Sequence, residues 1–387
     1  MTVARTITEQ MERASWIRRM FEEGLRLRAL LGPENVFDFT LGNPDVEPPE
    51  AVLAALRKYA ERPMPGMHGY MPNAGFPRVR EIIAERLSRA TGLGYTANHV
   101  IMTVGSAGAI NTVLKAMLDP GDEVIVLVPY FPEYRFYIEN HQGKLVAVET
   151  DANFRPDPKR IARAITSRTK ALILNSPNNP AGVVYTAKEL AEIEQVVAGT
   201  EVVVITDEPY KPIVFDAKRM PETASFITRS VGAMSWSKAQ GISGERIGYL
   251  AISPRLESAE ELRNACTFTN RILGYINAPA IWQWVEADAG EAVVDISGYE
   301  TKRNCMWKAL AEIGYECHKP EGSFYVFPKT PIADDIAFVR RLAREGVLTV
   351  PGSGFGRPGH LRISLTVPAQ TIERSIPAFE RAFHSPD

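Results

Sequence analysis

The sequence has few cysteines. Its 387 residues include three, Cys266, Cys305 and Cys317, which lack CxxC spacing and have no histidines grouped beside them. A disulfide framework requires paired cysteines, and a zinc site requires clustered cysteine or histidine ligands. We therefore expect no disulfides and no metal site, and the cysteine usage fits the reducing cytoplasm.

Long apolar runs are also absent. The longest apolar stretches, such as VIVLVPYF, are too short to span a bilayer. Residues 1–20, MTVARTITEQMERASWIRRM, carry charges throughout and lack the apolar core of a signal peptide. We expect a soluble, intracellular protein with no membrane partner.

Neither sign of charge is in large excess. The chain has 44 lysines plus arginines and 46 aspartates plus glutamates, for a formal net charge of -2. This balance gives no reason to expect nucleic acid as a partner. The length indicates one large domain and a smaller one rather than a single core.

Apolar segments of strand length alternate with helical segments in the middle of the chain. Expected strands lie at 99–104, 122–128, 144–149, 170–177, 201–206 and 230–236. Expected helices lie at 50–61, 76–92, 109–118, 135–143, 158–166 and 187–199. This order predicts an α/β fold with a mostly parallel sheet that helices cover on both faces.

The pattern changes near residue 291. A long helix is expected at 297–314, followed by short strands at 322–328 and 360–366 and a closing helix at 371–383. We predict a large domain over 45–290 and a small α+β domain formed by 1–44 and 291–387. The N-terminal part contributes a helix at 16–31, with four apolar residues on one face: Ile17, Met20, Phe21 and Leu25.

Parallel sheets bind ligands at the carboxyl ends of their strands, so the turns after the strands are the places to search. Asp207 follows EVVVIT, and burying its carboxylate is costly unless a cation or donors meet it. Tyr210 follows three residues later. The SPNNPAG turn brings Asn179 to the same edge. Taken singly, the aspartate could be a helix cap and the asparagine an ordinary turn residue.

The turn after HVIMTV is GSAGAINTVL, which runs into a helix. The free backbone N–H groups of Ser106 and Ala107 at that helix start would bind an anion such as phosphate. The glycines do not fit the dinucleotide-binding GxGxxG pattern, and no Gly-Lys-Ser/Thr closes the loop as in a Walker motif.

The fourth turn, SWSKAQGISGERIGY, carries Ser235, Ser237, Lys238 and Arg246. A lysine is usually an exposed surface residue. Here, however, four turns meet at one sheet edge and together supply an anion cradle, an amide, a phenol, a carboxylate and an amine. A cofactor with a phosphate, a basic ring nitrogen and an aldehyde would use all of them.

With these motifs the chain resembles the class I/II pyridoxal-phosphate-dependent aminotransferases of fold type I, related to aspartate aminotransferase, over essentially its whole length. SWSK…GERIGY matches the family's Ser-x-x-Lys with an arginine eight positions on. The resemblance implies a sheet of the seven-stranded type. It also implies that Lys238 forms the internal aldimine and shuttles the proton between Cα and C4′. Ser235 and Arg246, with Ser237 beside them, would bind the phosphate.

The other matches assign the rest of the cofactor site. By resemblance, Asp207 pairs with the pyridinium nitrogen, and Asn179 and Tyr210 bond the ring 3′-oxygen. Phe131, in VPYFPEY, stands where the family stacks an aromatic ring on the cofactor. Tyr70, in HGYMPNAGFPRVR, matches a tyrosine that reaches the phosphate of the neighbouring subunit, which implies a homodimer with shared active sites.

Substrate binding follows from two further matches. Arg362, in GHLRISLT, matches the arginine that clamps the substrate α-carboxylate, and Gly42, in TLGNPD, matches a glycine whose backbone meets the same group. The implied reaction moves an amino group from an L-amino acid to a 2-oxo acid by a ping-pong mechanism. Asn43 and Pro44 stand where relatives often carry Glu-Pro or Gln-Pro.

Specificity is where the resemblance is weakest. Relatives that take aspartate commonly place a lysine where this chain has Ala107, so a second substrate carboxylate needs another cation. Arg18 or Arg19 could supply it, or they could lie on a solvated helix face. Three aromatic side chains could instead form an apolar pocket: Trp16, Phe21 and Tyr275. The balance favours a neutral or broad-range amino donor with an acidic co-substrate such as 2-oxoglutarate.

Two alternatives share the same residues. Carbon–sulfur β-lyases and cyclopropane-forming synthases use this site for β- or γ-elimination. Some transcription regulators fuse the same fold to a DNA-binding domain, but this sequence has no helix-turn-helix segment before the fold and no basic patch.

Overall fold

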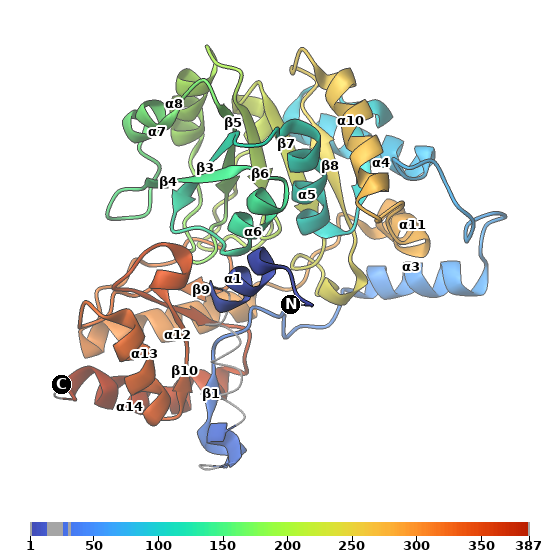
Figure 1. Cartoon of the computed structure of the whole chain (residues 1–387). Coiled ribbons are helices and arrows are strands. Elements are labelled where there is room, and N and C mark those ends of the chain that lie inside the picture. Colours follow the sequence, from blue (N-terminus) through green and yellow to red (C-terminus); the bar gives the residue numbers. More distant parts are fainter. Residues whose placement is uncertain (1, 14–25, 30–31, 386–387) are drawn as a thin grey trace.

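A computed structural model describes residues 2–13, 26–29 and 32–385, and its largest element is a seven-stranded sheet (Figure 1). The strand order is β2-β8-β7-β6-β5-β3-β4. In sequence order the strands are β2 (Val100–Thr103), β3 (Glu123–Val128), β4 (Lys144–Glu149), β5 (Thr169–Asn175), β6 (Val203–Asp207), β7 (Ser230–Ser235) and β8 (Gly248–Ile252). β8 runs antiparallel to both of its neighbours, and the other six strands are parallel. The predicted mostly parallel α/β sheet is confirmed.

β8 is the strand of this sheet that the sequence did not predict. It directly follows the Ser/Gly-rich lysine stretch, so its pattern is masked by turn residues. Gly248 at its start is required, because a Cβ there would overlap the Met234 carbonyl oxygen and lie 2.8 Å from the Gly105 Cα. This close approach brings the lysine stretch against the turn after β2.

The strands alternate their side chains between two helical layers. Val124 and Val126 of β3 pack with α5 (Gly105–Met117), α6 (Glu133–Asn140) and α10 (Ala259–Ile272), whereas Ile125 and Leu127 pack with α7 (Pro158–Ala164) and α8 (Ala187–Val197). This is the period of two that a strand buried on both faces requires.

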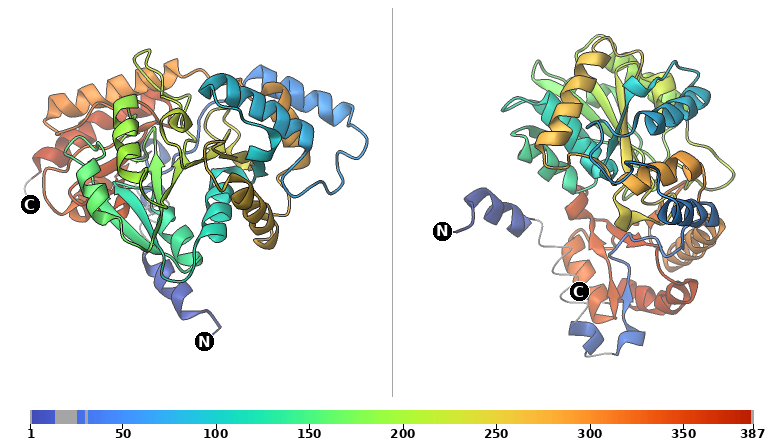
Figure 2. Two further views of the ribbon diagram at one scale, coloured as in Figure 1. Left: turned by 90° about the horizontal axis from the view of Figure 1, so that it is seen from above. Right: turned by 90° about the vertical axis from the view of Figure 1, so that its right-hand side faces the viewer.

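At the β2–β8 end, Val100, Met102 and Ala251 pack with three further helices, α3 (Glu50–Glu61), α4 (Pro77–Thr91) and α11 (Ala280–Ala289). Figure 2 shows these layers from above and from the side.

A second lobe lies below the sheet (Figure 1). Its helices are α12 (Ser297–Ile313), α13 (Asp335–Arg344) and α14 (Ala369–His384). Its strands are β9 (Tyr325–Val326), β10 (Val347–Leu348), β11 (Val350–Pro351) and β12 (Leu361–Ser364), with β11-β12-β9 forming an antiparallel sheet. β1 (Phe37–Asp38) from the N-terminal segment pairs in parallel with β10. The domain limits at 44/45 and 290/291 stay a prediction.

The N-terminal segment is described only in part. Residues 5–13 form α1 (Arg5–Arg13), and residues 26–29 are helical. Most of the helix expected at 16–31, including Trp16, Ile17, Arg18, Arg19, Met20, Phe21 and Leu25, lies outside the described residues. Among the helices that the structure describes, none combines the length and apolar character needed to cross a bilayer.

Candidate functional site

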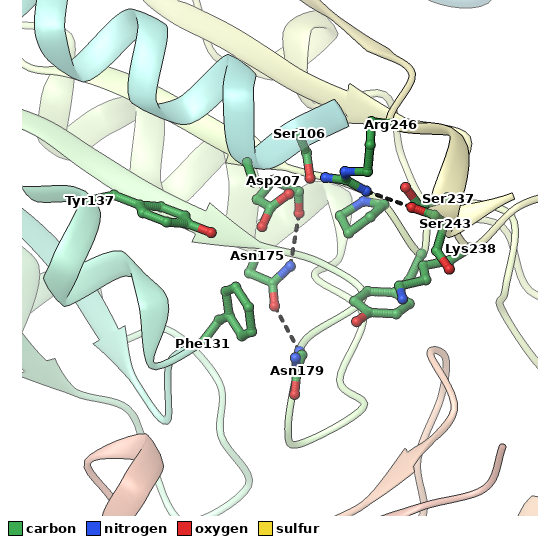
Figure 3. A pocket seen from close by; sticks show the side chains of 13 residues that line it. Ser106, Phe131, Tyr137, Asn175, Asn179, Asp207, Ser237, Lys238, Ser243 and Arg246 are labelled. Atoms are coloured by element: carbon green, nitrogen blue, oxygen red, sulfur yellow. Dashed lines mark hydrogen bonds between the residues drawn. The ribbon is translucent and has the colours of Figure 1, made fainter. Parts of the chain in front are cut away.

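A cavity of about 250 Å³ opens at the carboxyl ends of β5, β6 and β7, beside the start of α5 (Figure 3). The turns after five separate strands, β2, β3, β5, β6 and β7, meet here. The lining residues are Ser106, Ala107, Phe131, Tyr137, Asn175, Asn179, Asp207, Pro209, Tyr210, Ser237, Lys238, Ser243 and Arg246. Phe131 and Tyr137 lie on one side of the cavity, and Lys238, Ser237 and Arg246 lie on the other (Figure 3).

Lys238 supplies the amine of the cavity. Its Nζ donates a hydrogen bond to the Gly42 carbonyl oxygen at 2.8 Å. Burial, together with the nearby cations Arg246 and Arg362, lowers the pKa of Lys238 to about 8. A larger share of this amine is therefore neutral near physiological pH than of an exposed lysine, and the neutral form is the nucleophile.

Asp207 supplies a carboxylate with one free oxygen. Tyr134 Oη donates to its Oδ2 at 2.6 Å, whereas Oδ1 is buried and has no hydrogen-bond partner. Burial raises the pKa of Asp207 to about 6, even though the hydroxyl groups of Tyr134 and Ser106 oppose that increase. A buried carboxylate oxygen without a partner is costly, so Oδ1 fits a cationic N–H group that enters the cavity.

The opposite end of the cavity is rich in donors. Ser106 and Ala107 lie in the first turn of α5, where backbone N–H groups are free and the helix dipole favours an anion. Arg246 adds a guanidinium, which the Ser243 carbonyl oxygen holds at 2.7 Å. A Cβ on Gly105 would lie 3.0 Å from Arg246 Nη2, so glycine lets the arginine approach the helix start.

The two serines of the lysine stretch occupy different positions. Ser237 lines the cavity, and Ser235 is not among the lining residues. Ser235 Oγ lies 2.7 Å from Ser237 Oγ and accepts the Ser237 N–H at 3.1 Å. Ser235 therefore holds Ser237 in place from behind the cavity wall.

Asn175 connects the polar groups of β5 and β6. Its Nδ2 donates to the Asp207 carbonyl oxygen at 2.9 Å, and its Oδ1 accepts the Asn179 N–H at 2.7 Å (Figure 3). Sequence reasoning did not select Asn175, although its place as the last residue of KALILN was a usable signal. Tyr134, Tyr137, Pro209, Ser243 and Tyr325 were also not selected.

Arg362, on β12, is buried and contacts Asn179, one of the residues that line the cavity. Its Nη1 donates to Asn179 Oδ1 at 3.1 Å and its Nη2 to the Thr40 carbonyl oxygen at 2.6 Å, while Nε has no partner. The guanidinium stacks on the rings of Tyr325 and Phe355, at 4.6 and 4.9 Å from their centroids. Aromatic rings that pack against a buried guanidinium fix the orientation of its plane. Two-point binding of a carboxylate requires such a fixed plane.

Of the remaining residues that the sequence selected, some lie at the cavity and others do not. Gly42 lies beside Lys238, and a Cβ there would overlap the Tyr325 hydroxyl. Tyr210 lines the cavity and its Oη lies 3.3 Å from Tyr325 Oη. Tyr70 is not part of the cavity: it is 92% exposed. Arg18 and Arg19, which could either bind an acidic substrate side chain or lie on a solvated helix face, lie outside the described residues.

A sequence model of the family described as "Aminotransferase class I and II" matches residues 34–379. The chain belongs to this family. An aspartate/prephenate aminotransferase of Thermus thermophilus is 34% identical over 352 residues, which cover 88% of this chain and 89% of the relative. An aromatic-amino-acid aminotransferase of Thermococcus litoralis is 30% identical and covers 96% of both chains.

Solved structures give the same assignment for this aminotransferase. The crystal structure of an aminotransferase from Eubacterium rectale superposes with a TM-score of 0.95 at 33% identity and covers 100% of both chains. The protein is thus a pyridoxal-phosphate-dependent transaminase of fold type I, as the sequence predicted. The comparisons do not favour the carbon–sulfur lyase alternative.

Proposed function

We propose that this aminotransferase takes the amino group of a neutral or broad-range L-amino acid and passes it to an acidic 2-oxo acid such as 2-oxoglutarate, at the cavity around Lys238. The observation that carries this proposal is the convergence of an amine of lowered pKa, an unpaired carboxylate oxygen and an anion cradle on one cavity. These groups match the aldehyde, the ring nitrogen and the phosphate of pyridoxal phosphate.

The residues around the cavity would hold the cofactor at each of its polar groups. Arg246, Ser237 and the α5 N–H groups would bind the phosphate, and Asp207 Oδ1 would pair with the ring nitrogen. Asn179 and Tyr210 would bond the ring hydroxyl, and Phe131 would cover a ring face. When bound, pyridoxal phosphate supplies an aldehyde for the substrate amine and a ring that accepts electrons from the Cα–H bond.

Lys238 would act twice, first as the nucleophile toward the aldehyde and then as the base at the substrate Cα. Both roles need a neutral Nζ, and the two nearby arginines help to keep it so. Arg362 would bind the substrate α-carboxylate with Nε and an Nη atom. The Thr40 carbonyl and Asn179 hold the guanidinium in place before substrate arrives.

The part of the cavity that would receive the side chain of the substrate supports a neutral amino donor. In the described part of the chain, the cations that line the cavity are Lys238 and Arg246, which the aldehyde and the phosphate would engage. Phe131 and Tyr137 line the cavity with uncharged aromatic side chains, and Ala107 offers no charge. The names of the relatives, which include an aspartate/prephenate and an aromatic-amino-acid aminotransferase, are compatible with a broad range.

A homodimer in the cytoplasm completes the proposal. Tyr70 is 92% exposed, a larger exposed fraction than we expect for a tyrosine that contacts a bound ligand in a complete site. Exposed apolar side chains accompany it on the same chain: Leu41, Phe268, Ile272 and Ile276. A partner subunit that covers them would bring its own Tyr70 to the phosphate. Light scattering should give the mass of a dimer, and Tyr70→Phe should weaken cofactor binding without splitting that dimer.

The test of the reaction is a panel of L-amino acids added to the enzyme loaded with pyridoxal phosphate, without an acceptor. We expect neutral donors to convert the cofactor to its amine form and to release a 2-oxo acid, and 2-oxoglutarate to restore the starting spectrum. Lys238→Ala should lower turnover by on the order of 10³-fold, with the exposed Lys58→Ala as the control. Fast turnover of aspartate alone would contradict the neutral donor, and full activity of Lys238→Ala would contradict the site.

A further inference from the structure

Two consecutive aspartates stand at the start of α13, and their carboxylates make different contacts. Asp334 caps the helix, because its Oδ1 accepts the Ala337 N–H at 2.9 Å. Asp335 is buried, and both of its oxygens contact Ser353: Oδ2 accepts the backbone N–H at 2.6 Å and Oδ1 accepts the hydroxyl at 2.7 Å. Two short hydrogen bonds from one carboxylate fix the position of that serine.

Ser353 belongs to a short 3-10 helix, η4 (Gly352–Phe355), which lies between β11 and β12. The turn is tightly closed. The Arg357 N–H donates to the Gly352 carbonyl oxygen at 2.9 Å, and a Cβ on Gly352 would overlap the Arg357 carbonyl oxygen. Because the turn is closed, holding Ser353 also holds the other residues of η4. Asp335 thus joins α13 to a turn 18 positions further along the chain.

Phe355, the last residue of η4, contacts both parts of the proposed site. Its buried ring has its centroid 4.9 Å from the Arg362 guanidinium carbon. Its carbonyl oxygen accepts the Tyr130 N–H at 3.1 Å, and a Cβ on the following Gly356 would lie 2.8 Å from the Tyr130 ring. Tyr130 directly precedes Phe131, which lines the cavity. The end of η4 therefore packs against both the arginine and the aromatic side of the cavity.

We propose that Asp335 is a positioning residue for substrate binding, which acts on Arg362 through η4. By holding Ser353, it sets the Phe355 ring against the guanidinium. Arg362 donates from Nη1 and Nη2, whereas Nε has no partner, so the packed rings help to fix the plane in which Nε is presented. A carboxylate is bound at two points only when that plane is fixed. The inference rests on the role proposed above for Arg362.

The chemistry of Asp335 allows its charge and its contacts to be separated. The residue lies in the first turn of α13, where the helix dipole favours a carboxylate. Asp335→Asn would keep both contacts, because the amide oxygen can accept the Ser353 N–H and the NH2 group can donate to the hydroxyl oxygen. Asp335→Ala removes both acceptors and leaves the Ser353 N–H without its partner.

The first test measures binding without turnover. The probe is glutarate, which is 2-oxoglutarate without the oxo group, and calorimetry gives its Kd for the enzyme loaded with pyridoxal phosphate. Asp335→Ala should raise this Kd by about tenfold, and Asp335→Asn should keep it within about twofold. Asp334→Ala is the matched control: it removes the helix cap one residue earlier, so it should lower the melting temperature without changing the Kd.

A second test separates positioning from general damage to the fold. In Asp335→Ala, KM for amino acids should rise by about tenfold with a smaller change in kcat, because Arg362 binds the carboxylate in the ground state and in the transition state. An amine that lacks a carboxylate should react as with the wild type. Ser353→Ala removes one of the two contacts and leaves the start of α13 intact, so it should raise the glutarate Kd by about threefold.

The route through η4 is tested in a second background. Asp335→Ala added to Phe355→Leu should change the glutarate Kd little further, since the ring that it positions is already gone. The same loss in both backgrounds, an unchanged Kd in Asp335→Ala, or equal losses in Asp335→Ala and Asp334→Ala would overturn the inference. Failure of the proposed function is separate, since it would show as full activity of Lys238→Ala or as normal glutarate binding by Arg362→Lys.

Discussion

The Lys238 amine donates a hydrogen bond of 2.8 Å to the Gly42 carbonyl oxygen, and this contact joins residues 196 positions apart in the chain. The N-terminal segment that contains Gly42 also supplies the Thr40 carbonyl oxygen to Arg362. One short stretch of backbone therefore touches both the proposed nucleophile and the proposed carboxylate ligand. Substrate binding has to displace or share these contacts, which makes the segment a part of the site.

Gly42 should be intolerant of any side chain. In Gly42→Ala the new methyl group would overlap the Tyr325 hydroxyl, so we expect a loss of about 1–3 kcal/mol in the free energy of unfolding and a higher KM. The double variant Gly42→Ala with Tyr325→Phe removes the overlapping oxygen and should recover part of both. Denaturant unfolding and steady-state kinetics measure the two effects. If the second substitution recovers nothing, the clash is not the cause.

The pKa of Lys238 should be visible in how the cofactor-free enzyme reacts with an aldehyde. Burial and two arginines lower that pKa to about 8, so the rate of reaction with pyridoxal, which lacks the phosphate, should rise with pH through about 8. Arg246→Gln removes one cation and should move the profile to higher pH. Pyridoxal avoids the separate loss of phosphate binding. An unchanged midpoint in the variant would argue against the electrostatic role of Arg246.

Asp207 should make the free energy of unfolding of the cofactor-free protein depend on pH. Its folded pKa of about 6 exceeds the value of about 3.9 in an unfolded chain, so the folded state binds the extra proton. The free energy of unfolding should decrease from about pH 4 to about pH 6 and then level off. Asp207→Asn should lack this slope and, with cofactor, should lose kcat by on the order of 10²-fold. Thermal unfolding across pH compares the two proteins, and identical slopes would place the titration elsewhere.

Arg362 should matter only for substrates that carry a carboxylate. Arg362→Lys keeps the charge but loses the planar fork that binds two oxygens, and it leaves Asn179 Oδ1 without its donor. We expect kcat/KM for amino acids to fall by on the order of 10²-fold. The reaction of an amine that lacks a carboxylate should change little. Equal losses for both substrates would instead indicate damage to the buried stack on Tyr325 and Phe355.

The order of strands and helices was accessible from the sequence because burial on both faces produces unbroken apolar runs. KALILN and EVVVIT became β5 and β6, and Asn179 and Asp207 follow from the rule that such sheets bind ligands at their carboxyl ends. β8 was missed because GYLAI directly follows a glycine-rich turn, which hides the start of the apolar run. Ser235 and Ser237 could not be separated by sequence, since only the turn geometry decides which hydroxyl faces the cavity.

By itself, the sequence determined the fold class, the family and the chemical groups available at the sheet edge, because periodicity and strand-end positions are local properties of the chain. Only the tertiary structure decided which of those groups have partners. The free Oδ1 of Asp207 and the contact of the Gly42 carbonyl oxygen with Lys238 each depend on segments far apart in the chain. Hydrogen bonding and desolvation act through space over a few ångströms, so they are set by packing rather than by spacing along the sequence.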